Sequence, residues 1–131
     1  MAWRKGLVHS VSILRDGDKG GVVRHSMNYY RYDDERIRVC YAGPIAEAKI
    51  AKVSLGKVLF TTGIDDLMEI LEITKEFKNA GIKLDFKDII KWTKIHVYSR
   101  WSAVISLAAA LILQKEIAGE DVNRIIEKAL E

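Results

Sequence analysis

AGPIAEAKI (residues 42–50) and TTGIDDL (residues 61–67) are the two stretches that decide the fold of this chain. Around the first, apolar residues recur at helical spacing, which predicts a helix over residues 34–53 that begins at Asp33 or Asp34. Pro44 lies inside this pattern, where it removes a backbone donor and is expected to kink or divide the helix. Gly43 beside it is expected to let another element approach closely. The second stretch opens a further helix, in which we expect Thr62 to cap the first turn and Asp65 to complete a capping box.

The remaining segments extend this pattern in both directions. LVHSVSIL and GVVRHS, separated by the turn residues RDGDKGG, predict a β-hairpin over about residues 7–27. Residues 54–62 read as a loop, and Ala80-Gly81 and Asp85 mark the end of one helix and the start of the next. The predicted helices cover residues 34–53, 63–79, 85–118 (with one break near Ser99) and 119–130. The expected fold is mainly α (α+β), a hairpin packed on about four helices in one domain, residues 1–131.

Composition limits the classes of function. The net charge of +3 comes from 21 basic residues scattered among 18 acidic ones, which predicts no nucleic-acid partner. The longest apolar run covers residues 103–113 and is too short to cross a bilayer. The N-terminus has no apolar signal region. We therefore expect a cytoplasmic protein without a membrane partner. Cys40 is the single cysteine, so no internal disulfide forms, and we expect a buried, unreactive thiol.

Asp66 is the residue that the helical pattern singles out. Leu67, Ile70, Leu71, Ile73 and Phe77 define one apolar arc of the helix over residues 63–79. Asp66 lies within about 60° of the centre of this arc, whereas Asp65 points to the opposite side. A carboxylate that faces inward needs a helix N-terminus, a cation or a metal as its partner. Position alone is consistent with two roles: interaction with the helix dipole, or ligation of a metal.

In their order and spacing, the two stretches resemble the peptidase domain of the FtsH-type, ATP-dependent zinc metallopeptidases. The resemblance covers nearly the whole chain in element order and is greatest to stand-alone relatives without the AAA+ ATPase module. It implies that Asp66 is the third zinc ligand, although Gly63 is one residue nearer to it than in typical members. It also aligns Glu47 with the glutamate of the family's AE pair, which we interpret as structural.

The H-E-x-x-H helix that would supply two further zinc ligands and the general base does not occur in these residues. The histidines are His9, His25 and His96, so none is four residues from another. His9 and His25 on the hairpin, together with Asp66, form an alternative metal set, but hairpin histidines usually lie on the solvated face. His96 reads as a structural histidine. We therefore expect no catalytic residue and no cofactor in this chain, and zinc only where an upstream segment supplies H-E-x-x-H.

These observations lead to two hypotheses. The first is an FtsH-like zinc metallopeptidase domain that is catalytically incomplete, either as a pseudo-enzyme or because residues that belong before Met1 are missing from the sequence. The alternative is a non-catalytic module that binds peptides or oligomerises through LVHSVSIL, taken as an exposed edge strand. The expected partners are a peptide or protein substrate and further copies of the chain.

Overall fold

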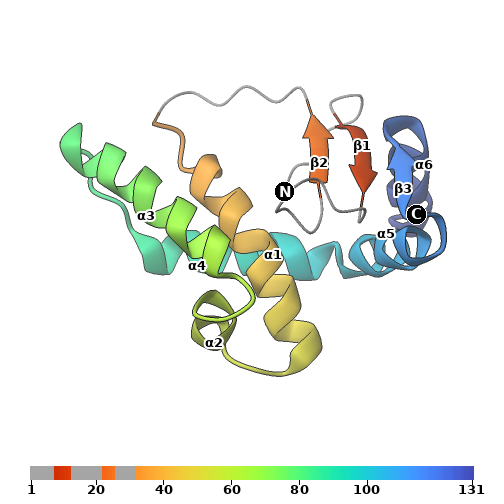
Figure 1. Cartoon of the computed structure of the whole chain (residues 1–131), viewed down its shortest axis with the longest axis horizontal. Helices are drawn as coiled ribbons and strands as arrows, with labels where there is room; N and C mark the ends of the chain where they lie inside the picture. Colours follow the sequence, from red (N-terminus) through yellow and green to blue (C-terminus); the bar gives the residue numbers. More distant parts are fainter. Residues whose placement is uncertain (1–7, 13–21, 26–31) are drawn as a thin grey trace. The chain divides into compact units, whose positions relative to one another are not determined.

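The computed structural model describes residues 8–12, 22–25 and 32–131, with side chains described from Tyr32 onward (Figure 1). The chain is mainly helical, as predicted. Its elements in chain order are β1 (Val8–Ser12), β2 (Val22–His25), α1 (Glu35–Ala51), α2 (Leu55–Leu59), α3 (Ile64–Asn79), α4 (Phe86–Ser99), α5 (Trp101–Gln114), β3 (Glu116–Ala118) and α6 (Gly119–Ala129).

The chain divides into two compact units. Of the described residues, unit 1 contains 32–99, which hold helices α1 to α4. Unit 2 contains the described residues 8–12, 22–25 and 100–131, so it combines β1 and β2 from the N-terminal part of the chain with α5, β3 and α6. Each unit has buried residues of its own.

In unit 1, helix α1 contacts each of the other three helices. Its buried side chains Ile37 and Ile45 belong to the same core as Ile73 and Phe77 of α3. Thr93 of α4 is fully buried, and its hydroxyl donates to the carbonyl of Ile89 at 2.7 Å. This bond satisfies the only buried polar side chain among the residues whose side chains are described.

Local signals place most helix ends in unit 1. The carboxylate of Asp33 accepts from the Glu35 amide at 2.9 Å, and that of Asp85 accepts from the Asp88 amide at 3.1 Å. At the end of α3, Gly81 has a φ of 74°, and the amide of Ile82 donates to the carbonyl of Phe77 at 2.9 Å. This is the Schellman arrangement predicted by Ala80-Gly81.

The predicted cap of α3 is wrong. Gly63 occupies the cap position and no side chain caps the helix, because the Thr62 hydroxyl bonds to Glu47 of α1 instead. A tertiary hydrogen bond has replaced the local one.

Three further predictions for this region are corrected. The predicted loop over residues 54–62 contains the short helix α2, whose first turn is capped by the Ser54 hydroxyl at 3.2 Å from the Lys57 amide. Pro44 does not divide α1, which runs through it with the proline buried, and the alternative of a kink at Pro44 stays a prediction. Gly43 meets no other element, since a Cβ there would find nothing within 4 Å. The close approach occurs at Gly63.

The predicted helix over residues 85–118 is two helices and a strand. The expected break falls at Arg100, between α4 and α5. Helix α5 ends at Gln114 because Lys115 has a positive φ of 65°, and β3 follows. The β-branched Ile117 of this strand is 1% exposed, so its burial stabilises the extended segment.

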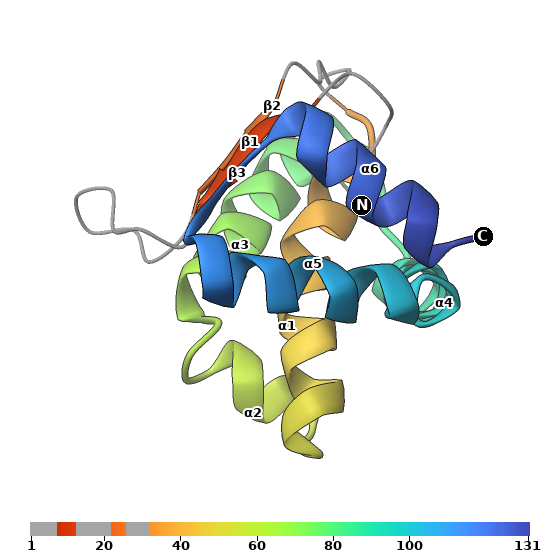
Figure 2. The same ribbon diagram turned by 90° about the vertical axis from the view of Figure 1, so that its right-hand side faces the viewer.

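Unit 2 is built on a three-stranded sheet with the order β2-β1-β3. Strand β1 pairs antiparallel with both neighbours, so that Val11 stands opposite Val23 on one side and Ile117 on the other. Helix α6 lies against β1 and β3 and packs on α5 (Figure 2). The core of this unit consists of Ala103, Ile117, Val122 and Ile126. Residues 13–21 and 26–31 lie outside the described residues, so the loop of the hairpin over 7–27 stays a prediction.

Candidate functional site

The two sequence stretches that suggested a function contact each other in unit 1. The Thr62 hydroxyl, just before α3, donates to Oε1 of Glu47 on α1 at 2.5 Å. A Cβ on Gly63 would lie 3.4 Å from the Pro44 ring and 3.1 Å from the carbonyl oxygen of Val58. Only glycine fits this position without displacing a neighbour. We call this contact region, formed by Pro44, Glu47, Thr62, Gly63 and Asp66, the α1–α3 seam.

Asp66 lies in the first turn of α3, half-buried at the seam, whereas Asp65 is exposed. The predicted orientations of both carboxylates are therefore confirmed. Burial raises the pKa of Asp66, and the carboxylates of Glu69, Asp65 and Glu47 raise it further. Every charged group that shifts this pKa is an acid, so the ionised Asp66 lies in a negative potential that a bound cation would relieve.

Cys40 lies on α1 close enough to this acidic group to be affected by it. Burial raises the pKa of its thiol to about 12, with further increases from Glu69 and Asp66 and a partial offset from Arg36. Its Sγ donates to the carbonyl of Arg36 at 3.3 Å. The expected burial of Cys40 is confirmed, and a thiol with this pKa is protonated at neutral pH and chemically unreactive.

The seam does not form a metal site from the side chains that the structure describes. From Tyr32 onward, no group of three or more His, Cys, Asp or Glu residues is arranged to hold a metal ion. Asp66 can offer one ligand there, and Glu47 uses one carboxylate oxygen to accept from Thr62. A tetrahedral zinc site with an open position needs three protein ligands.

Both histidines of the alternative set have side chains that lie outside those described. In the backbone register, His25 stands opposite Val8, and the pairing is irregular between Val8 and Ser10, where His9 lies. The side chains of His9 and His25 are not among those described. His96 is half-buried on α4, in unit 1.

The apolar arc predicted on α3 is correct in its centre and wrong at one edge. Ile70, Ile73 and Phe77 are buried and Leu67 is half-buried, but Leu71 is 54% exposed. Leu71 belongs instead to a stripe of exposed apolar side chains along the outer side of α3 and the preceding turn, namely Phe60, Ile64, Met68 and Leu71. We call this set the α3 stripe. Within α3, the spacing of four and three residues between Ile64, Met68 and Leu71 was present in the sequence as a second apolar face, and Phe60 lies before the helix.

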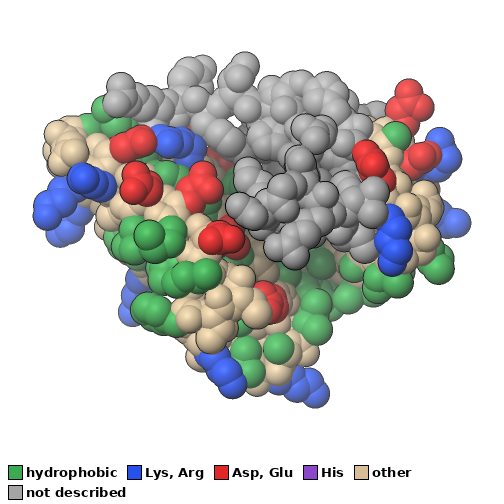
Figure 3. Space-filling view, viewed as in Figure 1, with side chains coloured by type: hydrophobic (Ala, Val, Ile, Leu, Met, Phe, Trp, Pro, Cys, Tyr) green, Lys and Arg blue, Asp and Glu red, His purple; other side chains and the backbone are tan. Residues whose placement is uncertain are grey.

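Charges of opposite sign accompany the exposed apolar side chains of α3 and α4. Helical geometry puts Asp65, Glu69, Glu72 and Glu76 along one flank of the α3 stripe, and Figure 3 shows acidic side chains following α3 beside hydrophobic ones. On α4, Trp92 and Ile95 are 45% and 43% exposed, and Lys87 and Lys91 of the same helix are exposed as well.

The expected edge strand is not an edge. Residues Ser10, Val11 and Ser12 of β1 pair with β2 on one side and β3 on the other. Both hydrogen-bonding edges of these residues are therefore used, and an added peptide strand could pair only with β2 or β3. The sequence missed this because β3 lies more than one hundred residues further along the chain.

Comparisons with protein-family models, with curated protein sequences and with solved structures give no significant match. Among the described residues, no single helix is long and apolar enough to cross a membrane, and α4 and α5 reach the required length and hydropathy only when taken together across their break.

Proposed function

We propose that this chain is the greater part of an FtsH-type metallopeptidase-like domain, in which Asp66 is the one zinc ligand that these residues provide. The zinc-binding H-E-x-x-H helix would come from a polypeptide segment outside the 131 residues. Zinc would then activate a water molecule for attack on a peptide carbonyl. Without that helix, the chain is a scaffold that does not hydrolyse peptides.

The observation that carries this proposal is the α1–α3 seam. The two stretches with the family resemblance contact each other through Glu47–Thr62 and Pro44–Gly63, and the contact leaves Asp66 half-buried among carboxylates. A carboxylate in such a potential gains more from a cation than one at an ordinary surface position. A carboxylate that forms a structural salt bridge at the start of a helix has a cation beside it, which lowers the pKa of that carboxyl.

The test compares the 131-residue chain with a longer protein that includes the residues encoded in frame upstream of Met1. We expect the longer protein to contain H-E-x-x-H, to bind one zinc ion per chain and to hydrolyse an unfolded protein such as casein. Asp66→Asn in the longer protein should lower zinc occupancy at least tenfold, because a first-coordination ligand is removed.

Asp65→Asn is the matched control, since Asp65 is adjacent in sequence, equal in charge and exposed. It removes part of the surrounding negative charge but no proposed zinc ligand, so it should lower zinc occupancy and hydrolysis far less than Asp66→Asn. An upstream frame without H-E-x-x-H, or equal zinc binding by the Asp66→Asn and Asp65→Asn proteins, would refute the metallopeptidase proposal.

A second candidate function, assembly with further copies of the chain, is favoured by the outer faces of α3 and α4. The α3 stripe has an acidic flank, and the exposed apolar residues of α4 have a basic one. Apolar patches with complementary charge are typical of interaction surfaces. Because the two faces differ, the contact would be heterologous and would build rings or longer assemblies.

Sedimentation at several protein concentrations tests this assembly. We expect association that weakens at high salt and is abolished by Met68→Glu in the α3 stripe. Ile50→Glu is the control, because Ile50 is 61% exposed on α1 of the same unit but lies outside the stripe. A protein that is monomeric at all concentrations, or two variants that behave alike, would contradict this function.

A further inference from the structure

Unit 1 contains a pocket of about 280 Å³ between α1, the segment that joins α1 to α2, and α4. Its wall is apolar and is formed by Ile45, Ala48, Val53 and Leu55. The polar groups at the pocket are Lys49, Ser54, Lys94 and Tyr98. The volume corresponds to about nine water molecules, so the space suits a small molecule rather than a protein segment.

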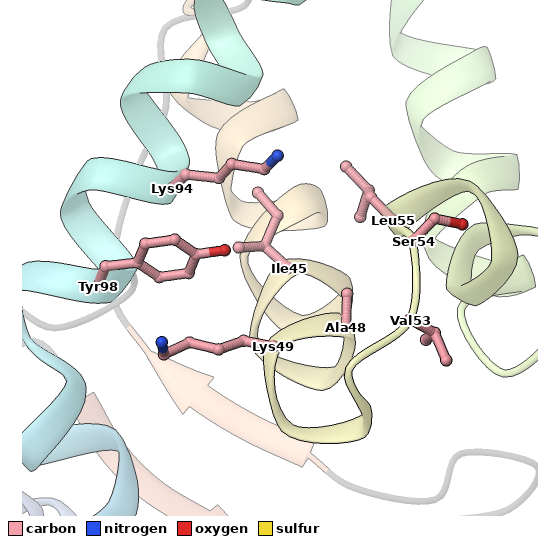
Figure 4. A pocket seen from close by; sticks show the side chains of 8 residues that line it. All are labelled: Ile45, Ala48, Lys49, Val53, Ser54, Leu55, Lys94 and Tyr98. Atoms are coloured by element: carbon pink, nitrogen blue, oxygen red, sulfur yellow. The ribbon is translucent and has the colours of Figure 1, made fainter.

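The polar groups are cationic or neutral. None of the eight lining residues is acidic, and two of them are lysines. Figure 4 shows the Lys94 ammonium above the Ile45 side chain and the Tyr98 hydroxyl beside it, while the Ser54 hydroxyl points away from Ile45. Lys49 lies over the Tyr98 ring at 4.6 Å from its centroid, which holds a second positive charge beside the ring.

We propose that this pocket binds a small organic monocarboxylate with a short apolar tail. The carboxylate would accept hydrogen bonds from Lys94 and Tyr98, and the tail would lie against Ile45, Ala48 and Leu55. Inorganic phosphate would leave the apolar wall in contact with water, and a neutral apolar molecule would accept no charge-assisted hydrogen bond from the Lys94 ammonium. The site lies on the α1–α4 side of unit 1 and is separate from the α1–α3 seam.

The binding test is a nuclear magnetic resonance titration of the whole chain with hexanoate. We expect saturable shifts of the backbone amides of Ala48, Ser54 and Tyr98, with a dissociation constant of about 1 mM. Acetate has the charge without the tail, and 1-hexanol has the tail without the charge. Each should bind at least fivefold more weakly than hexanoate.

Two variants test whether the carboxylate of hexanoate binds at Lys94 and Tyr98. Lys94→Met keeps most of the side-chain length and removes the charge, and it should weaken hexanoate about tenfold, the effect of one charge-assisted hydrogen bond. Tyr98→Phe keeps the ring and should weaken hexanoate about threefold. Lys91→Met is the matched control, since Lys91 is an exposed lysine of the same helix outside the pocket, and it should change the affinity less than twofold.

Several results would overturn the proposal. These are the absence of saturable shifts, binding of 1-hexanol or inorganic phosphate as tight as that of hexanoate, and equal loss of affinity in the Lys94→Met and Lys91→Met proteins. Circular dichroism of each variant keeps a folding defect distinct from a loss of binding.

Discussion

Asp66 is a side chain held where its neighbours disfavour its charge. The pKa of Asp66 is raised in the folded state, so folding favours the protonated carboxyl. The stability that this protonated form contributes is complete below the unfolded pKa near 4 and is lost as the pH rises through the folded pKa. We therefore expect Asp66→Asn to stabilise the 131-residue chain at pH 7 by about 0.5 kcal/mol, and by less at pH 4. Urea unfolding at both pH values measures this difference.

The sign of that change separates two roles of Asp66. A gain in stability at pH 7 is consistent with Asp66 acting as a metal ligand, because functional side chains often lower the stability of the fold. A loss of more than about 1 kcal/mol would instead show that Asp66 stabilises the fold as a structural carboxylate.

Cys40 should react slowly with thiol reagents. With a pKa of about 12, its thiolate fraction at pH 8 is far below that of a free cysteine, whose pKa is near 8.5. We expect its reaction with Ellman's reagent at pH 8 to be at least a hundredfold slower in native protein than in urea-unfolded protein. Equal rates in the two states would show that Cys40 is accessible and that α1 is not packed as described.

Helices α1 and α3 provide a matched pair of glycine substitutions. Gly81→Ala should cost about 1 kcal/mol, because its φ of 74° strains any residue with a Cβ even though a Cβ there would meet nothing within 4 Å. Gly43→Ala lies inside α1, also with nothing within 4 Å apart from its chain neighbours, and it gains helix propensity. Pro44 opposes this gain, because the proline ring disfavours the helical conformation of a preceding residue that carries a Cβ, so Gly43→Ala should change stability by less than about 0.5 kcal/mol. Thermal unfolding of the two variants measures the contrast, and equal losses of stability would contradict the described backbone.

Both ends of α3 were predicted within one residue from the sequence, but the cap at its beginning was not. Ala80-Gly81 ends the helix through bonds within its own last turn, so local residues suffice. Thr62 also has the local signal of a cap, but its hydroxyl bonds to Glu47, fifteen residues earlier. A contact of this kind depends on how α1 and α3 pack, which local pattern does not contain.

At the scale of the whole chain, the two units have cores of their own. Ile73 belongs to the core of unit 1 and Ile126 to that of unit 2. Each Ile→Val substitution removes one buried methyl group and should cost about 0.5–1.5 kcal/mol. We expect hydrogen exchange to accelerate mainly in the unit that carries the substitution, because cooperative units open separately.

The two substitutions are controls for each other. Acceleration across the whole chain by either one would show a single cooperative unit and contradict the division. The composition of unit 2 makes this a demanding test, since β1 and β2 come from one end of the sequence and α5, β3 and α6 from the other.

The sequence by itself determined the mainly helical fold, most helix ends and the inward direction of Asp66. These follow from helical periodicity and capping, which act over a few residues. Tertiary structure alone decided that β3 pairs with β1, that Gly63 rather than Gly43 is the point of close approach, that Leu71 is exposed, and that Lys94 and Tyr98 share a pocket with Ile45. Each of these depends on which distant segments meet, and periodicity along one segment carries no information about its partner.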